Sequence, residues 1–384
     1  MGLMRAQPDG PADASTGPAP TPRRALWATP PTELVGLGPM GTARAKAVWR
    51  QLREHPLEPL PETMPGCGKA ALSWLSEHLV TTAMTVQTTH TSADGTTKWT
   101  LDLAGRLVEA VLIPQPTRST VCVSTQSGCT RYCEFCATAR MGFLGNLPAD
   151  AIVAQVLLAK RFAPSPLTNV VMMGMGEPLD NLDEVLRAIA VIDEGLLISA
   201  RHVTVSTSGL IPKMERLWKE SRASLALSLH ATTQELRDRL MPRVRKWPLT
   251  ELCAWMREAT RNDPRHVFIE YTLLDGINDS DADAERLAEL LAGIRCRINL
   301  IPFNPTPSIA FERPSRERVL AFRDRLIGLG YLTIVRETRG DDAAAACGQL
   351  AAGSAPAPGS KTDSTPDSTA DSTPGPTIAS DRSS

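Results

Sequence analysis

The sequence lacks the features of a secreted or membrane protein. Its 384 residues contain no long apolar run, and the N-terminal stretch MGLMRAQPDGPADASTGPAP has no apolar core of the kind found in secretory signals. Ala6 stands where an N-myristoylation site would need Ser or Thr. The apolar stretches are short, as at residues 170–173, so no segment is expected to cross a membrane. We therefore expect a cytoplasmic protein.

Net charge is almost absent as well. The 41 Lys and Arg residues balance 42 Asp and Glu residues, so the whole chain gives no sign of nucleic-acid binding, and any basic surface must be local. Eight cysteines are present. In a reducing compartment they are expected to be metal ligands, catalytic thiols or core residues rather than a disulfide framework. We interpret Cys67, Cys253 and Cys296 as ordinary thiols.

Composition divides the chain into four parts. Residues 1–30 are rich in Pro, Ala, Gly and Thr, and residues 351–384 repeat Asp-Ser-Thr among prolines, so both are predicted to be disordered. Residues 31–95 are predicted to form a small accessory region of helices and a β-hairpin strand that could bind RNA. Residues 96–350 are the predicted core.

Two groups of basic residues could contact RNA phosphates, although a solvated surface is the simpler interpretation of each. One group lies on a predicted helix from Ala43 to Arg53, and the other on a loop between helices. They are Lys46, Arg50 and Arg53, and Arg243, Arg245 and Lys246.

The pattern of apolar residues predicts an α/β fold. Residues 83–114 alternate with period two around a Ser-Ala-Asp-Gly turn, which predicts a hairpin followed by a third strand. After Ser119, apolar strands alternate with helices, which indicates a parallel sheet covered by helices. About six such units predict an incomplete (β/α) barrel. The strands are STVCVST, NVVMMG, HVTVSTS, SLALSLH, HVFIEYTL, CRINLIP and LTIVRE, with helices near 148–163, 181–195, 211–220, 233–262, 281–293 and 314–329.

Unusual polar residues follow these strands, at the barrel end where active sites form. Each has an ordinary structural interpretation, since Gly-Pro pairs make turns and a lone His is usually only hydrogen-bonded. Their convergence on one rim favours a site. They are the cysteines after the first strand, residues 174–178 after the second, Ser206 to Gly209 in the third, Ser228 to His230 in the fourth, and Asn304 after the sixth.

Three cysteines in GCTRYCEFCATA, namely Cys129, Cys133 and Cys136, have Cys-x3-Cys-x2-Cys spacing. A 4Fe–4S cluster is usually held by four thiolates, so three leave one iron open to chelate a small molecule. The amine and carboxylate of S-adenosylmethionine (SAM) suit that iron. Zinc is the alternative, and it would need a fourth ligand from Cys122 or a His.

This spacing, with Phe135 before the last cysteine, resembles the radical SAM superfamily. Six segments between about Thr96 and Leu350 resemble, in order, the RlmN/Cfr group of RNA adenine methyltransferases. The closing TRGDD…CGQL is the most specific, because most radical SAM enzymes lack it. The segments are CVSTQSGCTRYCEFCATARMGF, NVVMMGMGEPLDN, VTVSTSG, LSLHA, NLIPFNP and TRGDDAAAACGQL.

The resemblance implies one 4Fe–4S cluster on Cys129, Cys133 and Cys136, and two SAM molecules per turnover. It places Gly176 and Glu177 at the methionine part of SAM. The remaining residues of the implied SAM pocket are Ser206, Ser228, Leu229, His230 and Asn304.

The resemblance also assigns three catalytic residues, Cys347, Cys122 and Glu109. Cys347 would accept a methyl group from one SAM. A 5′-deoxyadenosyl radical made from the second SAM would activate that methyl group for addition to the adenine ring. Glu109 would remove the ring proton, and Cys122 would release the RNA by forming a disulfide with Cys347. Without the resemblance, Cys347 would be a buried thiol in an Ala-rich helical stretch, Glu109 an exposed carboxylate and Cys122 a core residue.

The implied substrate is carbon 2 of an adenosine in 23S rRNA, with tRNA as a further candidate. Methylation at carbon 8, as in the Cfr branch, is an alternative, and so is a radical SAM enzyme with another substrate. A zinc- or cluster-stabilised RNA-binding module is the non-enzyme alternative. We expect a monomer that takes electrons from a flavodoxin or ferredoxin. Gly145, where family members often carry Arg, and the acidic tail are departures that concern how RNA is held.

Overall fold

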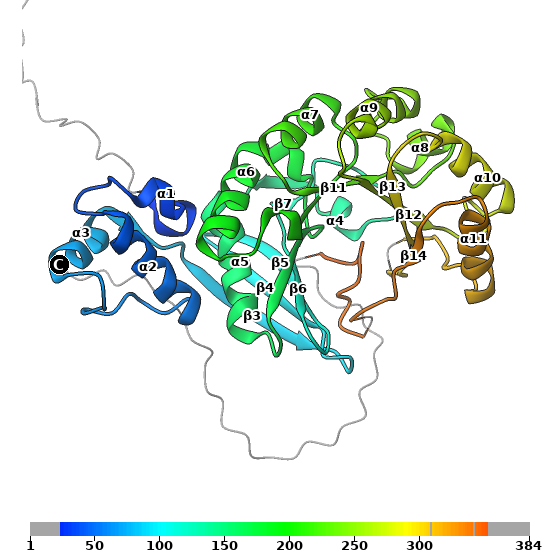
Figure 1. Cartoon of the computed structure of the whole chain (residues 1–384). Coiled ribbons are helices and arrows are strands. Elements are labelled where there is room, and N and C mark those ends of the chain that lie inside the picture. The colour runs from blue at the N-terminus through cyan, green and yellow to red at the C-terminus, as the bar shows by residue number, and fades with distance from the viewer. Residues whose placement is uncertain (1–23, 308, 341, 352–384) are drawn as a thin grey trace, which may run out of the picture.

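The computed structural model describes residues 24–307, 309–340 and 342–351 (Figure 1). Most of the two segments predicted to be disordered, residues 1–23 and 352–384, lies outside the described residues. The prediction of disorder is wrong for residues 24–30.

Residues 24–30 are folded because their apolar side chains have a place to pack. β1 (Arg24–Ala25) pairs in parallel with β2 (Leu79–Val80). The short helix η1 (Leu26–Ala28) packs against α5 (Ala149–Phe162) and buries Leu26 and Trp27.

The N-terminal helices form a small region beside the main sheet (Figure 1). The predicted helix at residues 43–53 is confirmed as part of α2. It buries Val48, Trp49 and Leu52 and leaves Lys46 and Arg50 exposed on the other side. Whether that basic face is only solvated or contacts RNA stays a prediction. The helices are α1 (Pro31–Leu34), α2 (Thr42–Glu54) and α3 (Lys69–His78).

One ten-stranded sheet organises the rest, in the order β14-β13-β12-β11-β10-β9-β6-β5-β4-β3. Its antiparallel part confirms the predicted hairpin and third strand as β3 (Met84–Thr91), β4 (Thr97–Leu103) and β5 (Arg106–Pro114). The hairpin turns at Gly95, which has a φ of 82°. The boundary expected at residue 95 therefore falls between two paired strands of the same sheet.

The parallel part of the sheet confirms the incomplete barrel. Its neighbouring strands follow one another in the chain, and six crossover connections join them. Among the described residues the sheet has edges at β14 and β3 and does not close. The seven parallel strands are β6 (Ser119–Cys122), β9 (Leu167–Met172), β10 (Val203–Thr207), β11 (Ser224–Ser228), β12 (Val267–Leu273), β13 (Cys296–Pro302) and β14 (Thr333–Val335).

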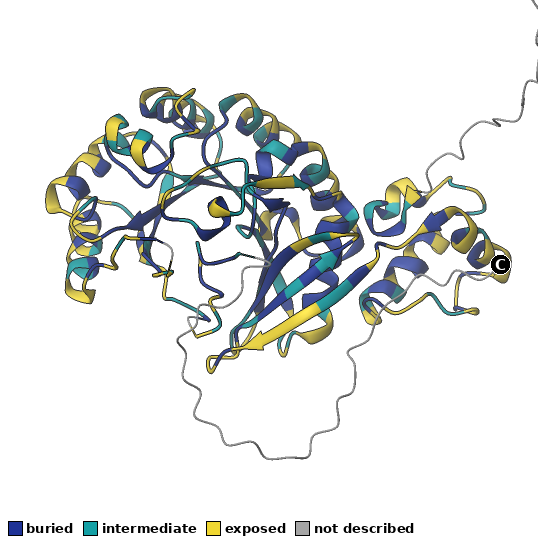
Figure 2. Cartoon of the chain, turned by 180° about the vertical axis from the view of Figure 1, so that it is seen from behind, coloured by how far each residue is buried: buried dark blue, intermediate teal, exposed yellow. Residues whose placement is uncertain are grey.

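Helices cover the outer face of this curved sheet (Figure 1), and their inward sides are buried (Figure 2). Apolar side chains on the strands and helices explain this, as in α5, where residues 151–159 are all buried. The covering helices are α5, α6 (Leu182–Ala190) with the π-helix η3 (Val191–Gly195), α7 (Ile211–Glu220), α8 (Gln234–Leu240), α9 (Leu249–Arg261), α10 (Asp281–Leu290) and α11 (Arg316–Gly328).

Shorter elements lie at the carboxyl end of the parallel strands. β7 (Gln126–Gly128) and β8 (Phe143–Asn146) form a two-stranded antiparallel sheet, with α4 (Ala137–Arg140) between them in the chain. The 3-10 helix η2 (Pro178–Asn181) also lies there and precedes α6, whereas η4 (Ala200–His202) lies at the amino end of the strands, directly before β10. No helix in the described ranges is both long and apolar enough to cross a bilayer.

Candidate active site

One cavity collects most of the predicted site residues. It lies at the carboxyl ends of the parallel strands, as the fold requires. The three catalytic or pocket residues that do not line it are Leu229, Cys122 and Glu109. The ten that do are Cys129, Cys133, Cys136, Gly176, Glu177, Ser206, Ser228, His230, Asn304 and Cys347.

The loop between β7 and α4 carries the three closely spaced cysteines. The Cys129 N–H donates to the Gly142 carbonyl at 2.8 Å, and the Cys136 N–H donates to the Cys133 carbonyl at 3.1 Å. Gly128, with a φ of 69°, lets the chain turn where a Cβ would clash with the Gly142 carbonyl. The loop is therefore fixed by its own backbone.

Burial raises the pKa of two thiols of this loop, Cys129 and Cys133. It brings the pKa of Cys129 to about 12 and the pKa of Cys133 well above its ordinary value, and repulsion from the neighbouring thiolates adds to both shifts. As thiolates the three side chains would repel one another. A cationic multi-iron group would suit this loop, because its positive charge would stabilise the three thiolates. Among the described residues, no three Cys, His, Asp or Glu side chains gather around a point where one metal ion could bind.

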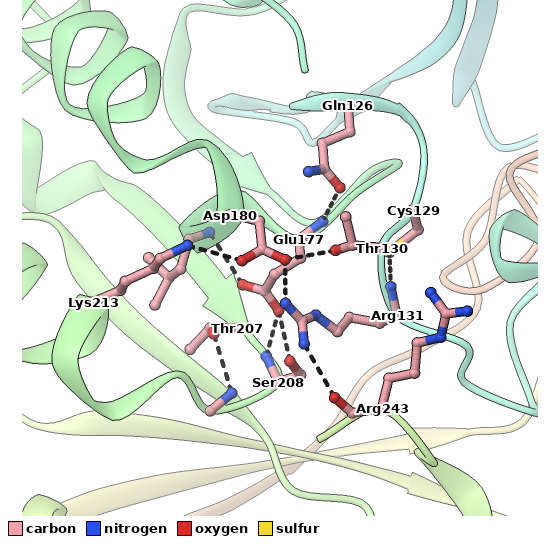
Figure 3. A network of polar contacts seen from close by, with 12 residues as sticks. Gln126, Cys129, Thr130, Arg131, Glu177, Asp180, Thr207, Ser208, Lys213 and Arg243 are labelled. Atoms are coloured by element: carbon pink, nitrogen blue, oxygen red, sulfur yellow. Dashed lines mark hydrogen bonds and ion pairs between the residues drawn. The ribbon is translucent and has the colours of Figure 1, made fainter. Parts of the chain in front are cut away.

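Glu177 is buried and held on both carboxylate oxygens (Figure 3). Leu179 N–H donates to Oε1 at 3.1 Å, while the N–H and hydroxyl of Ser208 both donate to Oε2 at 2.8 Å. Burial raises the pKa of Glu177, and these hydrogen bonds and Arg131 oppose that shift. Glu177 thus presents a preformed acceptor to the cavity, suited to an ammonium group.

A second carboxylate stands beside it. Asp180 accepts hydrogen bonds from the Thr130 hydroxyl at 2.7 Å and from Lys213 Nζ at 2.9 Å, and it pairs with Arg131 (Figure 3). Burial alone would raise the pKa of Asp180, but these donors hold it below its ordinary value. Asp180 therefore ties the three-cysteine loop, through Thr130 and Arg131, to the segment that follows β9.

The ends of β10 and β11 meet in the cavity. The hydroxyls of Ser206 and Ser228 lie 3.2 Å apart. Leu229, which follows Ser228, is fully buried in the core. His230 has a φ of 59°, which turns its ring toward the cavity. The Thr272 N–H donates to Nδ1 of His230 at 3.0 Å, so the neutral ring carries its proton on Nε2.

His230 makes the stability of the protein depend on pH. Burial, and next the charge of Arg237, lower the pKa of His230 to about 3. Because its pKa is depressed, the unfolded chain binds more protons below about pH 6.5, so stability is lost as the pH falls. We expect the free energy of unfolding of the apoprotein to drop by about 1.5 kcal/mol from this group between about pH 6.5 and pH 5.

Urea unfolding at several pH values measures this drop. His230→Gln should remove that part of the slope, and His90→Gln, at an exposed position on β3, should leave it. Equal slopes for the wild type and His230→Gln would contradict the assignment.

Cys347 lies on an irregular segment that crosses the cavity. The expected Ala-rich helix is wrong, because residues 342–350 form turns held by distant partners instead of a helical ladder. Ala137 N–H donates to the Gly348 carbonyl at 2.7 Å, and the Thr138 hydroxyl to the Leu350 carbonyl at 2.6 Å. Cys347 itself is exposed rather than buried in a core. Although the residue as a whole is exposed, protein atoms around its thiol desolvate it, and this, followed by the charge of Glu270, raises the pKa of Cys347.

Asn304 acts on this segment directly. Its side-chain amide donates to the Cys347 carbonyl at 3.0 Å, and its oxygen accepts from the Thr338 hydroxyl at 3.0 Å. The amide predicted to complete a SAM pocket is therefore also the group that positions Cys347.

Cys122 is buried behind the cavity at the end of β6. Burial raises the pKa of Cys122 to about 12, and repulsion from the Cys347 thiolate contributes to the shift. The two thiols therefore influence each other electrostatically. The structure contains no disulfide among the described residues, and all eight cysteines are free. A Cys122–Cys347 bond is thus not a feature of this state.

Glu109 on β5 is buried, where the sequence alone indicated an exposed carboxylate. Its Oε1 lies 3.2 Å from Lys98 Nζ, and its Oε2 accepts from the Ala351 N–H at 2.8 Å. Lys98 also donates to the Ala344 carbonyl at 3.1 Å. The Lys98–Glu109 pair therefore binds the Cys347 segment at two points, Ala344 before the cysteine and Ala351 after it.

Several residues near the cavity were not predicted. Glu270 and Thr272 on β12 line it, as do Met172 at the end of β9 and Met173 directly after it. Lys98 and Arg237 lie outside the six segments on which the family resemblance rests. In the sequence, these residues are marked only by a polar side chain in an otherwise apolar strand, or by a position next to the polar residues that follow the strands.

Known proteins with a similar sequence and fold identify the class of enzyme. Residues 123–291 match the Radical SAM superfamily. In the crystal structure of a radical SAM methyltransferase from Sphaerobacter thermophilus, 99% of the chain superposes on 85% of this one, with 41% identity and a TM-score of 0.78. The fold and the three-cysteine loop are those of a radical SAM enzyme.

Two relatives define the family. The dual-specificity RNA methyltransferase RlmN of Anaeromyxobacter dehalogenans is 45% identical over 324 residues, covering 82% of this chain and 87% of the relative. The enzyme of the same name from Syntrophobacter fumaroxidans is 49% identical over 275 residues, covering 70% and 80%. The chain belongs to the RlmN family of radical SAM methyltransferases.

Proposed function

We propose that the protein methylates a ring carbon of adenine in RNA, with carbon 2 of an adenosine in 23S rRNA as its main target and tRNA as a second substrate. The observation that carries this proposal is the position of Cys347, an accessible thiol held over the same cavity that the three clustered cysteines line. The names of the relatives, which are dual-specificity RNA methyltransferases, support it. We further propose a cytoplasmic monomer that receives electrons from a flavodoxin or ferredoxin.

The cavity fits a 4Fe–4S cluster and SAM. Cys129, Cys133 and Cys136 would hold the cluster, and Glu177 would accept hydrogen bonds from the amino group of SAM. Ser206, Ser228 and the Nε2–H of His230 offer polar contacts further along the cavity. When bound, the cluster and SAM supply a carbon radical that can abstract hydrogen from an unactivated C–H bond.

Cys347 is the methyl carrier in this proposal. An adenine ring carbon is a poor nucleophile, whereas a thiolate accepts a methyl group readily. Asn304 holds the backbone of Cys347, which orients the sulfur over the cavity. The pKa of the Cys347 thiol is raised, so the proposed methylation would also pass the thiol proton to solvent water.

Cys122 and Glu109 complete the proposed roles. Cys122, whose pKa responds to the charge of Cys347, would act as the second thiol, which would break the bond between Cys347 and RNA and form a disulfide. External reductant must then restore both thiols. Glu109 would take the ring proton, and its link to Ala351 places it beside the Cys347 segment.

Mass spectrometry tests the proposal. Protein purified anaerobically and supplied with SAM should carry a mark of about +14 Da on the Cys347 peptide, because one methyl replaces one hydrogen on a nucleophilic thiol. RNA from cells that express the protein should contain methyladenosine, and its position distinguishes carbon 2 from carbon 8.

Metal analysis of the same sample gives the control. Iron and sulfide in cluster proportions are expected, whereas about one zinc without sulfide would indicate a zinc-stabilised RNA-binding module. A sulfide-bridged cluster without any mark on Cys347 would contradict the methyl-carrier role and favour a radical SAM enzyme with a different substrate.

A further inference from the structure

Arg237 is an unusual buried cation. It lies on α8 and has no solvent exposure. Its Nη2 donates to the Ser208 carbonyl at 2.6 Å and to the Ser228 carbonyl at 3.3 Å. Its Nε and Nη1 have no hydrogen-bond partner in the structure. Unpaired N–H groups on a buried charge are costly, so their retention calls for an explanation.

No anion in the described part of the chain neutralises Arg237 by an ion pair. The adjacent Asp238 attracts it, but Asp238 lies 4.0 Å from Arg245 and accepts a hydrogen bond from Gln234. Burial lowers the pKa of Arg237 to about 10, which still leaves it charged at neutral pH. The protein therefore keeps a full positive charge in its interior without a dedicated counter-ion.

The surroundings of Arg237 point to the three-cysteine loop. Leu236 and Leu240, on the same helix, pack with Phe135, Cys133 and Cys136 in one apolar cluster. The Glu134 N–H donates to the Leu240 carbonyl at 2.9 Å, which fixes α8 to the loop. Cys133, once it is a thiolate, attracts the charge of Arg237, so the two side chains lie within electrostatic reach of each other.

We propose that Arg237 is the buried counter-cation of the 4Fe–4S cluster, a positioning residue whose charge and free N–H groups stabilise the reduced cluster. This inference rests on the proposed function. Three thiolates outweigh the positive charge of an oxidised cluster core, and one-electron reduction adds a further negative charge. A fixed cation nearby favours the more negative state, so it raises the reduction potential.

A merely structural role makes a different prediction. Arg237 also bonds Ser208, whose N–H and hydroxyl hold Glu177, so it could serve only to brace the SAM pocket. In that case its loss would destabilise the protein without cluster and would leave the potential unchanged. The counter-cation role predicts that loss of Arg237 lowers the reduction potential and does not destabilise the apoprotein. In the apoprotein the charge of Arg237 has no counter-ion, so it costs stability there.

The experiment compares Arg237→Met, Arg237→Lys and the wild type as full chains. Each is reconstituted anaerobically with iron and sulfide, and the reduced cluster is followed by electron paramagnetic resonance during titration with dithionite and mediators. Arg237→Met should lower the ratio of reduced to oxidised cluster at a fixed potential by about tenfold or more. A tenfold change corresponds to a reduction potential lower by about 59 mV for a one-electron couple. Arg237→Lys keeps the charge and should stay within about threefold of the wild type.

Arg239→Met is the matched control, since Arg239 is exposed on the same helix, and it should leave the potential unchanged. The thermal midpoint of apo Arg237→Met should equal or exceed that of the wild type. Should Arg237→Met bind no cluster while Arg237→Lys binds one, the need for charge is supported. Equal potentials in Met, Lys and wild type, or loss of the cluster from both variants, overturns the proposal. A wild type without sulfide-bridged iron instead overturns the proposed function itself.

Discussion

Replacing Cys347 by alanine is expected to abolish RNA methylation, with a loss of at least about a thousandfold in the rate of methyl transfer. Cys347 is the one thiol in the described chain that both lines the cavity and stands outside the three-cysteine loop. Alanine cannot accept a methyl group, and the neighbouring Cys122 is buried and has a pKa of about 12. No second thiol is therefore placed to substitute for it.

The measurement is single-turnover transfer of labelled methyl from SAM to RNA by the reconstituted protein. The iron and sulfide content should be unchanged in Cys347→Ala, because Cys347 is not among the proposed ligands. Cys253→Ala is the control, since Cys253 is a buried thiol on α9 outside the cavity, and it should retain methylation. Transfer by Cys347→Ala within about tenfold of the wild type would refute a methyl-carrier mechanism.

Features set by local pattern could be predicted from the sequence. The parallel strands, the hairpin at Gly95 and helix α2 follow from the period of apolar residues, which short segments encode. The rim position of the polar residues followed from the topology of a parallel sheet. The shared cavity of Cys129, Glu177 and Asn304 is a consequence of that topology.

Features set by distant contacts could not be predicted. Helix propensity favoured a helix in the Ala-rich stretch around Cys347, but hydrogen bonds to Ala137, Thr138 and Asn304 override it. The burial of Glu109 depends on Lys98, its diagonal neighbour on the paired strand β4, and on Ala351. Residues 24–30 are ordered by two distant contacts, the pairing of β1 with β2 and the packing of η1 on α5.

Lys98→Met is expected to lower the free energy of unfolding by about 3 kcal/mol. The side chains of Lys98 and Glu109 are only 10% and 6% exposed, so removal of the cation leaves a buried carboxylate without its counter-ion. The Ala344 carbonyl also loses its donor. The segment that carries Cys347 should therefore loosen, and the rate at which iodoacetamide alkylates Cys347 should rise.

Urea unfolding of the apoprotein and a timed alkylation followed by mass spectrometry measure the two effects. Lys98→Met combined with Glu109→Gln should recover part of the lost stability, because a neutral amide costs less to bury than an unpaired carboxylate. Lys219→Met is the matched control. Lys219 pairs with Glu215 at 2.6 Å, but the two side chains are 70% and 51% exposed, so its loss should cost less than about 1 kcal/mol. Equal costs for Lys98→Met and Lys219→Met would show that the buried pair does not hold the C-terminal segment in place.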